Sequence, residues 1–133
     1  MAKFRDDLLF KEECFKIIGI CMKIQSKLGP GFKEIVYKDA MEIEFVNDPI
    51  PYEREKPFPI MYEGFVLKHS FDSDYFVFNS IIIEVKAIPQ LGTDDFRQTM
   101  NYLKASKVKL GLLINFGDSK LRFHRIICTY PQE

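Results

Sequence analysis

The spacing of apolar residues predicts two helices at the start of the chain. Between residues 8 and 28 the apolar positions recur at intervals of three, four and seven, which is typical of an amphipathic helix. Gly29-Pro30-Gly31 ends this helix, and Pro30 is able to start a second one, which ends before Asn47. The first apolar stripe consists of Leu8, Cys14, Ile17, Ile18, Cys21, Ile24 and Leu28, and the second consists of Phe32, Ile35, Val36, Ala40 and Ile43.

After Pro51 the pattern changes from helices to strands. Segments rich in Phe, Tyr, Val and Ile are separated by proline and glycine, and a hairpin turn is expected around Asn79. Thr93 is a suitable N-cap residue for a third helix, with Asp94 and Asp95 in its first turn. The predicted order is α-α-β-β-β-α-β-β, in one domain that spans residues 1–133. The clearest strands are expected over residues 65–77, 81–87, 110–116 and 121–129.

The composition fits a single folded domain. The chain has 133 residues, 47% of them hydrophobic, which is enough for one core and too much for intrinsic disorder. No run approaches the roughly 18 apolar residues that a membrane span needs, and the charged start does not resemble a signal peptide. Cys14, Cys21 and Cys128 form neither a disulfide framework nor a CxxC metal site. We therefore expect a soluble, cytoplasmic protein in which Cys14 and Cys21 are buried.

Acidic and basic residues are concentrated in different parts of the chain. Lys+Arg and Asp+Glu number 19 each, and this balance weighs against nonspecific coating of nucleic acid. Residues 57–95 nevertheless contain two basic and six acidic residues, whereas residues 96–133 contain seven basic and two acidic ones. An acidic part that holds a cation beside a basic part that holds phosphates is one interpretation, and ordinary charge scatter is the other. The basic residues that could face phosphates are Lys104, Lys107, Lys109, Lys120, Arg122 and Arg125.

Two charged residues interrupt a strand that is otherwise apolar. Side chains alternate along a strand, which places Glu84 and Lys86 on one face and the apolar residues at 81, 83 and 85 on the other. Burying such charges costs several kcal/mol each unless partners are supplied. If the hairpin turns at Asn79, Asp74 lies opposite Glu84 and Asp72 lies opposite Lys86. The pattern therefore predicts a cluster of charges on one face of the hairpin.

Asp74 and Glu84 together form a plausible seat for Mg²⁺. Two like charges that face each other destabilise a sheet, but a divalent cation between them reverses the sign. Mg²⁺ is commonly held by one or two carboxylates together with waters and substrate phosphates. Lys86, on the same face, could orient an attacking water or help to deprotonate it. The alternative is a structural ion pair of Lys86 with Asp72 or Glu84, and spacing alone does not decide between the two.

The predicted helices offer further polar residues. Glu34 and Tyr37 share a face of the second helix, away from its apolar stripe, and Gln98 and Tyr102 share a face of the third. Taken singly, each is more typical of a solvated position. Taken together with the charged strand, they favour a site to which both helices contribute.

Several stretches, in the right order, resemble the GxxExxY protein family, a bacterial and archaeal group within the PD-(D/E)XK nuclease-like superfamily. The signature itself is Gly31-Phe32-Lys33-Glu34-Ile35-Val36-Tyr37, preceded by Leu28-Gly29-Pro30. The other matching stretches are Ile83-Glu84-Val85-Lys86-Ala87, Tyr102-Leu103-Lys104-Ala105 and Gly111-Leu112-Leu113-Ile114-Asn115-Phe116-Gly117.

The resemblance implies a fold and a set of roles. The fold would be a single restriction-endonuclease-like domain, an α/β (α+β) arrangement with a central mixed sheet flanked by helices. Asp74 and Glu84 would bind Mg²⁺ or Mn²⁺, and Lys86 would act on the attacking water. Glu34 and Gln98 would also contribute, as helix-borne residues do in many relatives. The chain departs from the superfamily's pattern at Ser73, where the name of the superfamily has Pro.

The leading hypothesis is a metal-dependent nuclease that hydrolyses phosphodiester bonds in nucleic acid, with DNA as the expected partner. The rival is a noncatalytic module that keeps the fold and binds a nucleic acid or a protein through an aromatic surface. Thirteen Phe residues exceed what a small core needs, so an exposed patch or a homodimer interface is conceivable. A purely structural network of Asp72, Asp74 and Lys86 is the third possibility.

Overall fold

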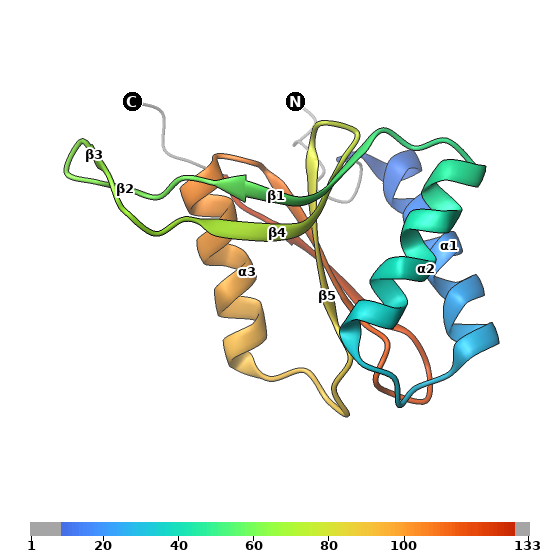
Figure 1. Cartoon of the computed structure of the whole chain (residues 1–133). Coiled ribbons are helices and arrows are strands. Elements are labelled where there is room, and N and C mark those ends of the chain that lie inside the picture. Colours follow the sequence, from blue (N-terminus) through green and yellow to red (C-terminus); the bar gives the residue numbers. More distant parts are fainter. Residues whose placement is uncertain (1–8, 130–133) are drawn as a thin grey trace, which may run out of the picture.

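Three helices and seven strands follow one another in residues 9–129, the part of the chain that the computed structural model describes (Figure 1). The predicted order is confirmed with two changes: a short strand at residues 61–62 is added, and the strand expected over residues 65–77 is divided into two, at 65–66 and 71–77. The expected contribution of Leu8 lies outside the described residues. The elements are α1 (Lys11–Leu28), α2 (Glu34–Asn47), β1 (Tyr52–Phe58), β2 (Met61–Tyr62), β3 (Phe65–Val66), β4 (Phe71–Val77), β5 (Ile81–Lys86), α3 (Thr93–Ser106), β6 (Leu110–Asn115) and β7 (Arg122–Ile127).

The central sheet has five strands in the order β1-β4-β5-β6-β7. Neighbouring strands are antiparallel except β5 and β6, which are parallel and are connected through α3. Helices α1 and α2 pack on one face of the sheet and α3 packs on the other (Figure 1). The predicted mixed sheet flanked by helices is therefore confirmed. No helix in residues 9–129 is long and apolar enough to cross a bilayer.

The alternation along β5 assigns its side chains to two separate cores. Ile81, Ile83 and Val85 belong to the core between the sheet and α1 and α2, whereas Ile82 belongs to the core beneath α3. Cys14 and Cys21 are buried in the first core, as the spacing predicts. Because side chains alternate, Glu84 and Lys86 lie on the face of Ile82. The charged residues of β5 thus face the side of the sheet that α3 covers.

The register of the β4–β5 hairpin is the one expected from a turn at Asn79. Tyr75 pairs with Ile83 and Val77 pairs with Ile81, around a three-residue loop. Phe78 and Asn79 both have positive φ, at 54° and 52°, as the two central residues of a type I′ turn do, and the N–H of Ser80 donates to the carbonyl of Val77 at 3.0 Å. The turn therefore fixes which residue of β4 meets Glu84.

The predicted apolar stripe of α2 is wrong. Ile35 and Ile43 are 50% and 61% exposed, whereas the buried side chains are those of Tyr37, Lys38, Met41 and Phe45. Tyr37 is able to lie in the core because its hydroxyl donates to the carbonyl of Gly29 at 2.6 Å. A phenol with a satisfied hydroxyl serves as a core residue, and the helix is turned accordingly.

Gly117 lies where the loop after β5 crosses the turn after β6. A Cβ atom built on Gly117 would stand 2.2 Å from the carbonyl oxygen of Ile88, so only glycine allows this approach. Asn115 holds the crossing together, because its side chain accepts from the backbone N–H of Ile88 at 3.0 Å and donates to the carbonyl of Ile88 at 2.9 Å. The crossing fixes the chain two residues beyond Lys86.

We expect Gly117→Ala to lower the free energy of unfolding by about 1–3 kcal/mol, because the two backbones must separate to admit a methyl group. Gly19→Ala is the matched control, since Gly19 lies in α1 with nothing within 4 Å of its added Cβ. That change should raise the free energy of unfolding by roughly 0.5–1 kcal/mol. Urea denaturation measures both, and equal stability of Gly117→Ala and the wild type would contradict the close crossing.

Candidate functional site

Asp74 and Glu84 meet where β4 and β5 cease to pair through their backbones. The ladder of the hairpin runs as far as Tyr75 and Ile83. At the next position, the N–H of Asp74 donates to Oε2 of Glu84 at 3.2 Å, and the N–H of Val85 donates to Oδ2 of Asp74 at 2.7 Å. Two carboxylates therefore take the place of backbone acceptors and lie side by side, as the register predicts.

The environment of Glu84 disfavours its charged form. Its side chain is 5% exposed, and burial together with the neighbouring charge of Asp74 raises the pKa of Glu84 to about 8. A hydrogen bond from the backbone of Asp74 and the charges of Lys86 and Lys38 lower the pKa, but they do not compensate. A further positive charge beside the two carboxylates would favour the ionised pair.

Lys86, the last residue of β5, is turned toward α3. Its Nζ donates to Oε1 of Gln98 at 3.5 Å and lies 3.8 Å from a carboxylate oxygen of Asp95. The expected position opposite Asp72 is not found, because β4 leaves β5 and stays with β1, where Asp72 pairs with Pro57. Figure 1 shows this divergence of β4 from β5.

Lys38 of α2 is a site residue that the sequence pattern does not predict. It is 6% exposed, and its Nζ donates to Oδ1 of Asp74 at 2.9 Å and to Oε2 of Glu55. Burial alone would lower the pKa of Lys38, but the hydrogen bonds to Glu55 and Asp74 outweigh it, and the pKa is raised. The ammonium is therefore held in its charged form next to a candidate metal ligand.

Three of the predicted helical residues lie at the site. Burial raises the pKa of Glu34, at the start of α2, and the charges of Lys86 and Asp74 also act on it. Gln98 accepts from Lys86, as described above. Burial raises the pKa of Tyr102 as well, with a further contribution from the charge of Glu84, and the Tyr102 ring stacks on Phe71 at 4.0 Å.

Tyr37 acts from the core rather than at the site. It is fully buried, stacks on Phe116 at 4.6 Å and accepts a hydrogen bond from the backbone N–H of Phe32 at 3.2 Å. With its bond to Gly29, the hydroxyl links both sides of the loop between α1 and α2. Tyr37 therefore orients the start of α2, from which Glu34 projects.

The predicted basic residues do not form one surface around the carboxylates. Lys104 and Lys107 lie at the far end of α3, and Lys107 is roughly 13 Å along the helix axis from Gln98. Asn115 of β6 has Lys86 as its register partner on one side and Arg122 on the other, so the side chains of Lys86 and Arg122 lie on the same face of the sheet. The Nε of Arg122, however, donates to Asp118 at 3.0 Å. Lys109 and Lys120 are exposed.

Arg125 belongs to the opposite face of the sheet. It pairs in register with Leu112, a residue of the core beneath α1 and α2, and its guanidinium donates to the carbonyl of Leu9. Its expected place on a surface shared with Arg122 is therefore corrected. Alternation along β7 separates the two arginines, because they are three positions apart.

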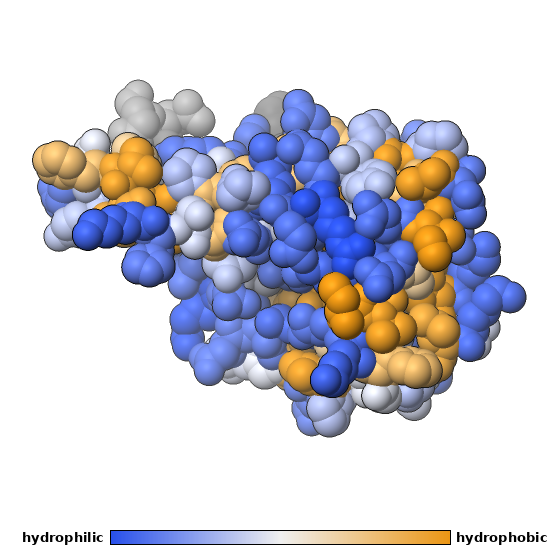
Figure 2. Space-filling model, in the orientation of Figure 1, coloured by the Kyte–Doolittle hydropathy of each residue, from blue (hydrophilic) through white to orange (hydrophobic). Residues whose placement is uncertain are grey.

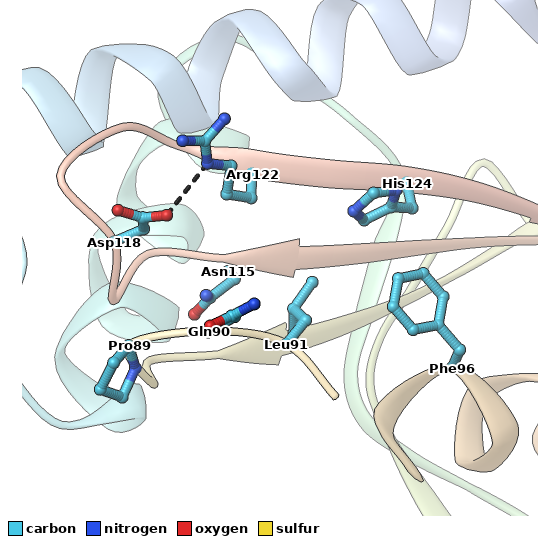
Figure 3. Close-up of a pocket in the computed structure, with 8 residues that line it drawn as sticks. All are labelled: Pro89, Gln90, Leu91, Phe96, Asn115, Asp118, Arg122 and His124. Atoms are coloured by element: carbon cyan, nitrogen blue, oxygen red, sulfur yellow. Dashed lines mark hydrogen bonds and ion pairs between the residues drawn. The ribbon is translucent and has the colours of Figure 1, made fainter. Parts of the chain in front are cut away.

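A pocket of about 550 Å³ is lined by the loop before α3, by Phe96 of α3 and by residues at the ends of β6 and β7 (Figure 3). Phe96 of α3 meets the His124 ring of β7 edge to face at 4.8 Å in this pocket, and the Arg122–Asp118 pair lies at its other end. The register places His124 two strands from Glu84, which is roughly 10 Å. This pocket is separate from the carboxylate site.

A sequence model of the PD-(D/E)XK nuclease superfamily matches residues 11–126. The chain belongs to this superfamily. The crystal structure of SSO0001 has a similar fold, with a TM-score of 0.54 and 16% sequence identity over 96% of this chain and 70% of that chain. A comparison with curated proteins gave no match. The PD-(D/E)XK fold that the sequence implies is thereby confirmed, and the three helices and mixed sheet agree with it.

The donor set of this PD-(D/E)XK domain fits a hard divalent ion held by few protein ligands. Within residues 9–129, no group of three or more His, Cys, Asp or Glu side chains is arranged to hold a metal. Two adjacent carboxylates, with the remaining positions left to water and phosphate, match the way in which proteins commonly bind Mg²⁺. Burial and the charge of Asp74 raise the pKa of Glu84, so a divalent ion beside the pair would favour its ionised form.

Glu84→Gln is expected to stabilise the metal-free protein at about pH 9 and to change it little at about pH 5. Because the pKa of Glu84 is raised to about 8 in the folded chain, folding retains a proton that the unfolded chain releases. The free energy of unfolding of the wild type therefore falls as the pH rises from the ordinary pKa of a glutamate to about 8. Glutamine carries no charge at any of these pH values, so the variant avoids this decrease, which is on the order of 1 kcal/mol or more.

Urea denaturation in EDTA at both pH values measures this effect. Asp72→Asn, which removes an exposed carboxylate from the same strand, is the matched control and should show no comparable gain at the higher pH. A Glu84→Gln variant that is destabilised equally at both pH values would contradict the strained carboxylate pair.

Proposed function

We propose that this PD-(D/E)XK domain is a metal-dependent nuclease that hydrolyses phosphodiester bonds in nucleic acid. The observation that carries the proposal is the adjacency of the Asp74 and Glu84 carboxylates, with the ammonium of Lys86 on the same face of β5. Asp74 and Glu84 are the residues that would hold Mg²⁺ or Mn²⁺. Such an ion polarises a phosphodiester and lowers the pKa of a bound water.

The residues around Lys86 support a role in placing the attacking water. Gln98 and Asp95 of α3 hold its ammonium at 3.5 and 3.8 Å, which limits the positions that the long side chain can adopt. An ammonium held in this way can donate a hydrogen bond to a water and stabilise negative charge that develops on it. Glu34, on whose pKa the Lys86 charge acts, borders the same region from α2.

DNA is the substrate that we propose, and the cytoplasm is the proposed location. The described cysteines, Cys14, Cys21 and Cys128, are all buried and free, as a reducing compartment favours. Exposed Lys104 and Lys109 are available to phosphates at a distance from the carboxylates. A substrate that extends well beyond one phosphate, such as a nucleic-acid strand, would contact both regions.

Removal of either proposed metal ligand should abolish cleavage. We expect Glu84→Gln and Asp74→Asn to reduce the rate of DNA cleavage in Mg²⁺ or Mn²⁺ at least 100-fold, and Lys86→Met to act similarly, because each removes a group that the transition state requires. Asp72→Asn, on the same strand but exposed, should retain activity. Equal cleavage by the wild type and Glu84→Gln would contradict the assignment.

The alternative proposal is a noncatalytic binding module, and the β2–β3 hairpin favours it. This hairpin extends beyond the body of the domain, and Tyr62, Phe65 and Val66 are 64%, 73% and 63% exposed (Figures 1 and 2). Apolar side chains on a projecting hairpin suit a protein partner or a second copy of the chain.

Calorimetric titration with Mg²⁺ near neutral pH separates the two proposals. The nuclease is expected to bind the ion and to lose binding in Asp74→Asn, because the carboxylates are the ligands. Absence of Mg²⁺ binding in the wild type, with binding of a partner lost in Phe65→Ser, would favour the module.

A further inference from the structure

Lys38 connects the carboxylate site to an acidic side chain outside it. The ammonium donates to Oδ1 of Asp74 at 2.9 Å and to Oε2 of Glu55. The two acceptors differ in exposure, because the Asp74 side chain is 18% exposed and the Glu55 side chain is 50% exposed. One cation thus has an inner partner at the site and an outer partner close to solvent.

The surrounding structure fixes the position of Lys38. The hydroxyl of Tyr75, in the centre of β4, donates to the carbonyl of Lys38 at 2.6 Å and holds this turn of α2 against the strand. Glu55, in β1, lies opposite Asp74 of β4, because the residues on either side of Glu55 pair with Tyr75 and Ser73. The backbone of Glu55 has a φ of 57°. A non-glycine residue in this left-handed region is uncommon and merits a functional explanation.

Both oxygens of Asp74 are engaged in this arrangement. Oδ2 accepts from the backbone of Val85, and Oδ1 accepts from Lys38. A divalent ion at Asp74 would share an oxygen with one of these donors, and at Oδ1 it would compete with the ammonium. Displacement is possible without leaving the buried ammonium unpaired, since Glu55 already contacts it.

We propose that Lys38 is a positioning residue that serves as an internal counter-ion, neutralising Asp74 until a divalent ion binds and then pairing with Glu55 alone. The proposal deepens the proposed function, because it rests on a metal seat at Asp74 and Glu84. Its consequence is that the domain binds metal weakly by itself, since each ion competes with a positive charge that is built into α2. A bound phosphate adds negative charge and favours displacement of Lys38.

Two substitutions should shift Mg²⁺ affinity in opposite directions. Lys38→Met removes the competing charge and keeps the length of the side chain, so Mg²⁺ should bind about tenfold more tightly, the factor that corresponds to 1.4 kcal/mol. Glu55→Gln removes the alternative partner and leaves Lys38 on Asp74, so Mg²⁺ should bind several-fold more weakly. Lys23→Met is the matched control, because it breaks an exposed ion pair with Glu44 at 3.0 Å and should leave the affinity unchanged.

Calorimetry with Mg²⁺ and the Mg²⁺-dependent rise in melting temperature are the two measurements, on the full chain. If the Lys38 ion pairs had a structural role only, their loss would lower the melting temperature of the metal-free variants. The Mg²⁺ affinities of the two variants would then not differ. If Lys38→Met does not fold, Glu55→Gln still tests the proposal, because the Glu55 side chain is half exposed. Unchanged affinity in Glu55→Gln would then overturn it.

The outcomes also distinguish this inference from the proposed function. One outcome is that the wild type binds Mg²⁺ and cleaves DNA while the Mg²⁺ affinities of Lys38→Met and Glu55→Gln change in the same direction or not at all. That result would overturn the counter-ion role of Lys38 and leave the proposed nuclease activity intact. Mg²⁺ binding in the expected order of affinity without any cleavage would support the counter-ion and contradict the nuclease. A wild type that binds no Mg²⁺ would overturn both.

Discussion

The charge of two adjacent carboxylates is the constraint around which this PD-(D/E)XK domain is arranged. Asp74 and Glu84 each accept a backbone N–H from the opposite strand, so neither can move away without loosening the hairpin. Positive charge reaches them from two elements, through Lys38 of α2 and Lys86 of β5. Burial and the charge of Asp74 nevertheless raise the pKa of Glu84 to about 8, so the ionised pair is disfavoured in spite of the two ammonium groups. A divalent cation at the pair would supply the missing positive charge, which is consistent with the metal seat proposed above.

The divergence of β4 and β5 determines which charges reach the pair. β4 remains with β1 over its whole length, whereas its backbone pairing with β5 runs over three positions. Asp72 consequently stays with β1, and Lys86 turns to α3 instead. The pairing of β4 with β1 also sets Glu55 opposite Asp74, and Glu55 contacts Lys38 there. The course of β4, close to β1 and away from β5, thus bears on the partners of both lysines.

The strands, the hairpin register and the carboxylate pair follow from local rules. Alternation assigns the faces of β5, and a single tight turn sets Asp74 beside Glu84. The same rules do not predict which face of α2 is buried, because a sequence pattern counts Tyr37 and Lys38 as polar. Both are buried because other elements supply hydrogen-bond acceptors. The carbonyl of Gly29, in the loop before α2, accepts from Tyr37, and the carboxylate of Asp74, in β4, accepts from Lys38. Spacing of Lys38 with Met41 and Phe45 is the signal that points to a charge on the core face.

The distribution of basic residues bears on how the proposed nuclease would hold its substrate. Arg125 faces α1, Arg122 is paired with Asp118, and Lys107 is roughly 13 Å from Gln98 along α3. A phosphate at the carboxylates would therefore meet Lys86 and Lys38, but no cluster of arginines among the described residues. Its binding would depend mainly on the metal, and metal binding would in turn depend on the phosphate, because Lys38 opposes an ion that arrives alone. Such coupling suits a domain with 19 basic and 19 acidic residues, in which net charge contributes little to the attraction of nucleic acid.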